Sequence, residues 1–248
     1  MSSEPSLPAA PPTVADRRRP QRLGSMASPF TRPLPLALVL AFATGIPLMV
    51  TAVRVVQIPL GAWPEDALRL ASAPVAWFLH SLAGVLFGVL GPLQFVRALR
   101  RRFGALHRLA GWAFVMAGAG LGLSGLALLL QVESIATGLL DAARAMLGLV
   151  LIAALQLAVA AARARDMREH LAWMVRAYAI GMGTTTVWLA VLPIHLITGE
   201  RLTGLASDLA LVGMWLLSIA VGEWVVRRLV LRTPRQPDFS ANPRRPHT

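Results

Sequence analysis

Four histidines lie in or beside the long apolar runs of this 248-residue sequence, and imidazole is a side chain that can bind haem iron or carry protons. They are His80, His107, His170 and His195. His80 and His195 are expected near the outer ends of two membrane helices, at nearly the same depth, and form one candidate pair. His107 and His170 open two helices at the opposite edge of the membrane and form a second candidate pair.

Two histidines at one depth on different helices are what a b-type haem with two axial ligands requires. Glycines follow both histidines along one helix face and would leave room for a flat ring: Gly84 and Gly88 after His80, and Gly111, Gly118, Gly122 and Gly125 after His107. The same small-residue spacing is typical of closely packed membrane helices. The pattern therefore leaves haem binding and helix packing open. For His107 and His170 a third interpretation is helix capping or contact with lipid head groups.

Arg176 and Glu223 lie within apolar runs, where an unpaired charge is costly. Both are expected at a similar depth on consecutive antiparallel helices, which predicts a structural ion pair between them. Two alternatives remain open at this point. Arg176 marks the true start of its span, or Glu223 pairs with Arg227 one helical turn later.

No complete catalytic constellation is present, so the sequence does not predict whether the protein is an enzyme. Cysteine is absent, which excludes disulfides, thiolate metal sites and iron–sulfur clusters. There is also no phosphate-binding loop and no arrangement resembling a hydrolase site. If haem binds, its iron would be held by the same four histidines.

The composition places these groups in a membrane. Of the residues, 56% are hydrophobic and only 15% are charged, against roughly 25% in soluble domains. The mean hydropathy is +0.61. All 24 basic residues are arginine, and the net charge of +12 would by itself suggest a nucleic-acid partner. The arginines lie between apolar runs and in the tails, which excludes nucleic acid and makes the lipid bilayer the expected partner.

Six apolar segments are each long enough to cross a hydrocarbon core of about 30 Å. They are residues 34–53, 75–97, 109–130, 142–163, 171–197 and 208–230. Of the 24 arginines, 20 flank these segments on one side, which predicts that both termini are cytoplasmic. The expected fold is an all-α, polytopic membrane helix bundle with six transmembrane helices in the bacterial inner membrane.

The predicted transmembrane domain covers residues 34–230 and is flanked by two tails. Residues 1–33 are rich in proline and arginine, a composition that cannot bury enough apolar surface to order itself. Residues 231–248 are basic as well. Both tails are predicted to be disordered and cytoplasmic.

The motifs around the histidines resemble a known family. They are His80 with Gly91-Pro92-Leu93-Gln94-Phe95, Leu106-His107-Arg108 with Gly111, and His170-Leu171-Ala172-Trp173-Met174 with Arg176. In these elements the chain resembles the bacterial membrane proteins grouped as domain of unknown function 2306. The arrangement is also loosely similar to small transmembrane b-type cytochromes, which implies ligand roles for His80, His107 and His170. His195 departs from the family pattern.

These observations favour an integral inner-membrane protein of this uncharacterised family that transfers electrons through haem b, with a membrane redox protein or a quinone as its partner. The alternative is a non-enzymatic scaffold or assembly partner whose histidines are structural. A transporter is disfavoured, because the sequence shows no pair of broken helices and only one acidic residue, Glu223, inside the predicted spans away from their ends.

Overall fold

The computed structural model of the protein describes residue 45 and residues 47–134, 136–199 and 202–231. The predicted tails, 1–33 and 231–248, lie outside the described residues except for position 231, and so does most of the first predicted span. Every regular element in the described part of the chain is a helix, which confirms the all-α class there.

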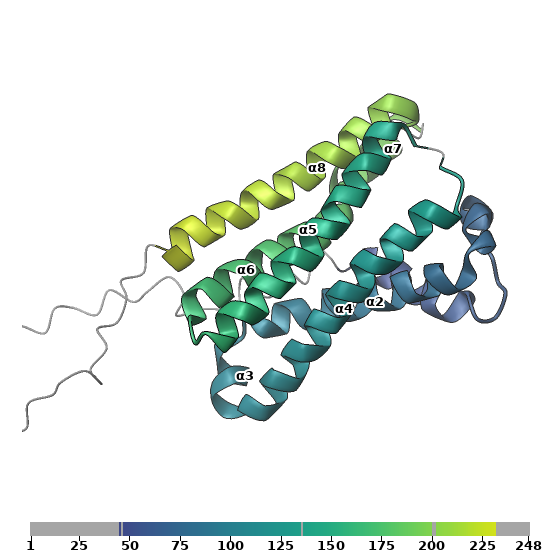
Figure 1. Cartoon of the computed structure of the whole chain (residues 1–248). Helices are drawn as coiled ribbons and strands as arrows, with labels where there is room; N and C mark the ends of the chain where they lie inside the picture. Colours follow the sequence, from purple (N-terminus) through teal and green to yellow (C-terminus); the bar gives the residue numbers. More distant parts are fainter. Residues whose placement is uncertain (1–44, 46, 135, 200–201, 232–248) are drawn as a thin grey trace, which may run out of the picture. The chain divides into compact units, whose positions relative to one another are not determined.

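The helices in chain order are Pro47–Gln57, the 3-10 helix η3 (Glu65–Ser72), α2 (Pro74–Gln94), α3 (Arg97–Arg102), α4 (Gly104–Gln131), α5 (Gly138–Arg163), α6 (Met167–Gly181), α7 (Gly183–Thr198), α8 (Gly204–Val225) and the π-helical turn η4 (Val226–Leu231) (Figure 1).

Four of these helices are long and apolar enough to cross a membrane: α2, α4, α5 and α8 with its extension to Arg228. They match four of the predicted segments to within a few residues at each end. Many of their leucines are exposed, including Leu109 at 68% and Leu130 at 88%. In water such a surface would be costly, whereas lipid chains accept it. The chain is therefore a multi-pass membrane protein.

Consecutive helices pack against one another, because their connections are short: α2 on α4, α4 on α5, α5 on α6, and α7 on α8. Local signals fix the helix ends. Pro74 occupies the first turn of α2, where its missing N–H costs nothing. Asp166 caps α6 by accepting from the backbone N–H groups of Arg168 at 3.1 Å and Glu169 at 3.0 Å. Gly199 ends α7 in the left-handed conformation with φ 71°.

The single helix predicted over residues 171–197 is wrong, because the chain breaks at Met182 into α6 and α7. The last carbonyls of a helix lack partners within it. Here α8 supplies two donors: the Ser218 hydroxyl donates to the Ala179 carbonyl at 2.8 Å, and the Trp215 indole N–H donates to the Ile180 carbonyl at 2.9 Å. The break is thus stabilised by side chains from a neighbouring helix.

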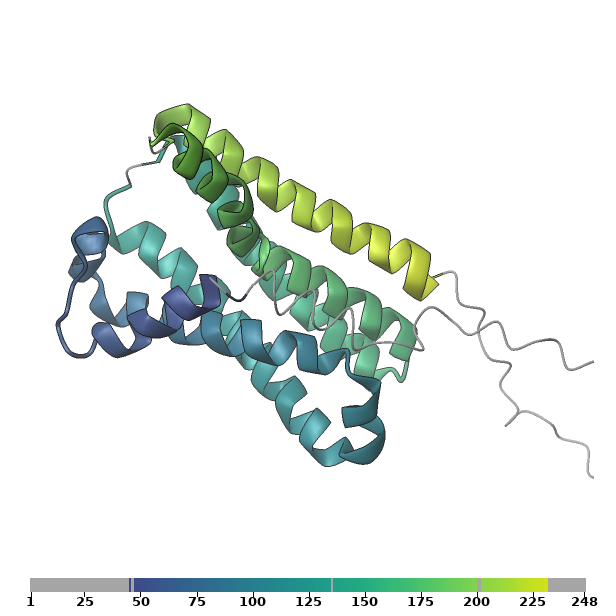
Figure 2. The same cartoon turned by 180° about the vertical axis from the view of Figure 1, so that it is seen from behind.

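The glycine after the break makes room for that tryptophan. A Cβ atom at Gly183 would overlap the Trp215 ring, so a larger residue would expel the indole. Contacts further along show that α6 and α7 lie in succession beside α8, with opposite chain direction: Thr186 meets the carbonyl of Met214, and Arg176 meets Glu223. Figures 1 and 2 show α8 running past both helices.

An aromatic layer made by Phe87, Phe114 and Tyr178 joins α2, α4 and α6. The ring centroids of Phe87 and Phe114 are 4.3 Å apart, and those of Phe87 and Tyr178 are 5.8 Å apart. Glycines allow this approach, because a Cβ at Gly91 would overlap Tyr178 and one at Gly118 would lie 2.7 Å from the Phe87 ring. The layer separates the two ends of the helices. Following the predicted orientation, we call the end with the α4–α5 loop the outer end and the end with α3 and the α5–α6 turn the inner end.

Candidate functional site

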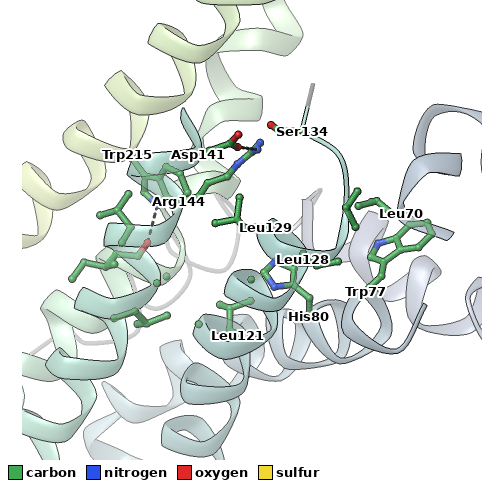
Figure 3. Close-up of a pocket in the computed structure, with 18 of the residues that line it drawn as sticks. Leu70, Trp77, His80, Leu121, Leu128, Leu129, Ser134, Asp141, Arg144 and Trp215 are labelled. Carbon is green, nitrogen blue, oxygen red and sulfur yellow. Dashed lines mark hydrogen bonds and ion pairs between the residues drawn. The ribbon is translucent and has the colours of Figure 1, made fainter. Parts of the chain in front are cut away.

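A cavity of about 300 Å³ lies at the outer end, between α2, α4, α5 and the break that separates α6 from α7. Its walls are mostly leucine, glycine and tryptophan. The charged or strongly hydrogen-bonding side chains that line it are Arg69, His80, Ser134, Asp141 and Arg144. Figure 3 shows Ser134, Asp141 and Arg144 together toward one end, with His80 further along the cavity beside Leu128. The volume is at the lower limit of typical small-molecule sites, about 300–1,000 Å³.

His80 is held in one orientation by α4. Its Nδ1 lies 3.2 Å from the Ser124 hydroxyl oxygen, and the Ser124 hydroxyl donates to the Gly120 carbonyl at 2.6 Å. Because the single hydroxyl hydrogen is used there, Ser124 can only accept from the imidazole, so Nδ1 of neutral His80 carries the proton and Nε2 keeps its lone pair. Gly125 lets the ring lie close to α4, since a Cβ there would be 3.4 Å from Cε1 of the imidazole.

The charged end of the cavity carries two guanidinium groups and one carboxylate. Arg144 and Asp141 form an ion pair of 3.3 Å, one turn apart on α5. Arg69 reaches the backbone carbonyl of Glu133 at 3.3 Å, and among the described residues it has no carboxylate within ion-pair distance. The cavity is therefore apolar around the histidine and positively charged at its other end.

The helix break forms part of the cavity wall. Ile180 and Gly181 at the end of α6 line the cavity, and so does Trp215, whose indole caps the Ile180 carbonyl. Irregular backbone at membrane depth is tolerated where it is buried in protein or lines a cavity. One broken helix therefore borders the candidate site, where the sequence predicted none.

The structure does not bring His195 to this cavity. His195 lies in the last turn of α7, and His80 is the only histidine among the described residues that line the cavity. The candidate pair of His80 and His195 therefore does not line one cavity.

The other two histidines lie together at the inner end. His107, in the first turn of α4, is close enough to His170 for their charges to interact. The His170 Nδ1–H donates to the Ala158 carbonyl at 2.8 Å, which fixes its tautomer. Nδ1 of His107 and Nε2 of Gln94 are buried and have no hydrogen-bond partner among the described residues. The Gln94 side chain packs against α4 one turn after His107, since a Cβ at Gly111 would lie 3.3 Å from the Gln94 amide oxygen.

The structure brings Arg176 and Glu223 together, with Arg176 Nε 2.9 Å from Glu223 Oε2. Arg227 also pairs with Glu223, through Nε and Oε1 at 2.9 Å, so both partners considered for this carboxylate are used. The Arg176 guanidinium further lies 4.8 Å from the Trp173 ring centroid. With side chains 24% and 31% exposed, Arg176 and Glu223 form the more protected of the two pairs.

Sequence reasoning missed most of the cavity-lining polar residues. Arg144 and Asp141 were assigned to a connection or the edge of a span, whereas α5 begins at Gly138 and holds both on its first turns. Ser124 follows Gly120 and Gly122 in a run of small residues, and this run was a usable signal for a site of close approach. Trp215 carried no such signal, because its role depends on a break that local sequence did not predict.

In the described part of the chain, no group of three or more histidine, aspartate or glutamate side chains is arranged to hold a metal ion. Residues 77–226 match a family described as "Predicted membrane protein (DUF2306)". No curated protein and no solved structure matches the chain.

Proposed function

We propose that this chain, which belongs to the predicted membrane protein family DUF2306, is a six-span protein of the bacterial inner membrane that binds haem b through His80 and serves electron transfer. One observation carries the haem assignment. It is the imidazole of His80, held by Ser124 in a membrane cavity that also contains two arginines.

The proposed topology has both termini in the cytoplasm. Four helices are long enough to span, and α6 with α7 lies along α8 as one further crossing. Residues 167–198 would measure about 48 Å as a straight helix at about 1.5 Å per residue, which exceeds the hydrocarbon core of about 30 Å. The sixth crossing is the predicted segment 34–53. The arginine asymmetry of 20 to 4 supports the orientation.

The cavity lining offers the proposed haem one ligand from the protein. Nε2 of His80 keeps the lone pair that an iron ligand needs. Arg69 and Arg144 are the cationic groups that would hold haem carboxylates, and guanidinium pairs strongly with carboxylate. The described residues do not fit two-histidine ligation in this cavity, because none of His107, His170 and His195 lines it.

The chain's own residues would perform three tasks at such a site. Ser124 orients the imidazole, Asp141 holds Arg144, and the leucines and tryptophans of the walls exclude water. When bound, haem supplies one-electron redox chemistry. A membrane redox protein or a quinone is the partner that this chemistry requires.

The test is an absorption spectrum of the purified, dithionite-reduced protein after expression with added haem precursor. The wild-type protein and His195→Ala should show Soret and α bands, whereas His80→Ala should lose at least nine-tenths of them. His195→Ala is the matched control, because it removes an imidazole that lies outside the cavity. A wild-type protein without these bands, or a His80→Ala variant that keeps them, would overturn the proposal.

A scaffold or assembly partner with structural histidines is the second candidate. The observation that favours it is the hydrogen bond between His80 and Ser124, which joins α2 to α4 without any ligand. In that case His80→Ala should lower the thermal midpoint of protein purified without haem. The wild-type spectrum would show no haem bands even when haem is supplied.

A further inference from the structure

The inner end of the helices carries arginines from two separate segments of the chain. The short helix α3 has three arginines in its last turn, Arg100, Arg101 and Arg102. Arg108 follows in the first turns of α4, and Arg163, Arg165 and Arg168 flank the α5–α6 turn. Both cartoon views place α3 and the α5–α6 turn at the same end of the helices (Figures 1 and 2).

The His107–His170 pair connects these two segments. His107 interacts electrostatically with Arg100, with Arg108 and with His170. His170 is tied to the end of α5 by its hydrogen bond to the Ala158 carbonyl, and Arg168 lies two residues before it on α6. We name Arg100, Arg108 and Arg168, together with His107 and His170, the inner basic patch.

The charges of this patch are not neutralised within the described part of the chain. None of its three arginines has a carboxylate within ion-pair distance there. Asp166, the nearest acid in sequence to Arg168, already accepts from two backbone N–H groups at the start of α6. Arg168 Nε and His107 Nδ1 are buried without a hydrogen-bond partner among the described residues. Buried donors are normally satisfied, so the patch has the character of a site for an anion.

Apolar side chains surround the patch and remain exposed. Leu106 and Leu109 flank His107 on α4, Trp112 follows one turn later, and Met167 begins α6. Tryptophan is typical of the boundary between lipid head groups and chains. A free phosphate ion would use the charges and leave these side chains uncovered. A phospholipid would use both, with its head group on the arginines and its acyl chains on the leucines.

We propose that the inner basic patch binds the phosphate head group of an anionic phospholipid from the leaflet at the inner end of the helices. Guanidinium groups form paired, charge-assisted hydrogen bonds with phosphate oxygens, and basic pockets between membrane helices are recognised sites for anionic head groups. The proposal is independent of haem, because none of the patch residues lines the outer cavity.

Two measurements on the full-length protein in detergent test it. Native mass spectrometry with equal amounts of phosphatidylglycerol and phosphatidylcholine should show the wild-type protein retaining at least fivefold more of the anionic lipid. Thermal unfolding should show a midpoint raised by several degrees by phosphatidylglycerol, and by less than one degree by phosphatidylcholine or inorganic phosphate.

The matched variants are Arg168→Gln, within the patch, and Arg228→Gln, which removes the same charge from an exposed position in η4. Arg168→Gln should lose at least half of the lipid-induced shift, whereas Arg228→Gln should keep it. Equal retention of the two lipids by the wild-type protein would overturn the proposal without any variant. If inorganic phosphate raises the unfolding midpoint as much as phosphatidylglycerol does, the ligand of the patch is free phosphate and not a phospholipid. If the two variants lose the same part of the lipid-induced shift, the inner basic patch is not the place where the lipid binds.

Discussion

The outer cavity and the inner basic patch are built around the same chemical unit, a histidine whose Nδ1–H is given to an oxygen atom. At the outer end the oxygen belongs to the Ser124 hydroxyl, and at the inner end it is the Ala158 carbonyl. The surroundings differ. His80 lines an apolar cavity in which Arg144 is paired with Asp141, whereas His107 and His170 lie among arginines without carboxylate partners in the described residues. The same residue type therefore lies in an apolar cavity in one place and among these arginines in the other.

The aromatic layer keeps these two regions apart, so the largest expected effect comes from breaking it. In Gly91→Ala the new methyl group would overlap the Tyr178 ring, which is packed between Phe87 and Phe95. Overpacking of this kind costs about 3 kcal/mol when neighbours cannot move. We expect a strongly lowered unfolding midpoint in detergent.

Gly213→Ala is the control for this prediction, because a Cβ at Gly213 meets nothing within 4 Å. Alanine is favoured over glycine in a helix interior by about 0.5–1 kcal/mol, so this variant should be as stable as the wild type or more stable. If both alanine variants are equally stable, Tyr178 does not need the space above Gly91.

The second prediction concerns paired charges at the inner end, where Glu223 holds one protected and one exposed arginine. Arg176→Ala should lower the free energy of unfolding by about 1–2 kcal/mol, because it removes the ion pair from a partly buried site and uncovers Trp173. Arg227→Ala removes the pair whose arginine is 74% exposed, and should cost at most about 0.5 kcal/mol.

A double-mutant cycle of Arg176 with Glu223, measured by chemical unfolding in detergent, tests the same pair. The double alanine variant should be less destabilised than the sum of the two single variants, because Glu223→Ala alone leaves Arg176 in the membrane without its carboxylate and the double variant does not. Strict additivity of the two changes would contradict an energetic role for the pair.

How far the sequence predicted this structure depends on whether the signal was local. Four spans were predicted to within a few residues because each is an apolar run of about 20 residues bounded by charges. The proximity of Arg176 to Glu223 was predicted because helix depth follows from residue count. The break at Met182 was not, since Gly181 and Gly183 look like the other glycines of the chain. What distinguishes them is the ring that each one faces: Phe87 for Gly181, and for Gly183 the Trp215 ring, which belongs to a segment more than 30 residues away.

The cavity was harder to predict than the spans for the same reason. His80 was identified from its position within an apolar run, but its contact with Ser124 was not predicted. Depth alone does not determine which faces of two helices meet. The packing of α2 on α4 decides that, and it depends on the shapes of glycines and aromatic rings along both helices.

The third prediction concerns Trp215, which lines the outer cavity and caps the helix break. Trp215→Phe keeps an aromatic ring but removes the indole N–H that donates to the Ile180 carbonyl at the helix break. The expected loss is about 1–2 kcal/mol of unfolding free energy. Trp224→Phe is the control, since Trp224 is 56% exposed and should change stability by less than about 0.5 kcal/mol. Equal losses would show that the indole hydrogen bond at the break contributes nothing.

The smallest expected effect on stability is that of Ser124→Ala, which tests the comparison between His80 and His170 most directly. The acceptor of His80 is a side chain and can be removed by Ser124→Ala, whereas the acceptor of His170 is a backbone carbonyl that no substitution removes. The change should cost about 1 kcal/mol. It should also release His80 from the Nδ1–H tautomer and leave His170 in it.

Nitrogen-15 NMR of histidine-labelled protein in detergent distinguishes the two neutral tautomers and measures this effect. Ser218→Ala is the control, because it removes a hydroxyl from α8 that bonds the Ala179 carbonyl and touches neither histidine. In the wild type and in Ser218→Ala, both His80 and His170 should carry the proton on Nδ1. If His80 keeps that proton in Ser124→Ala, the orientation of the imidazole comes from the packing of α2 on α4 and not from the serine.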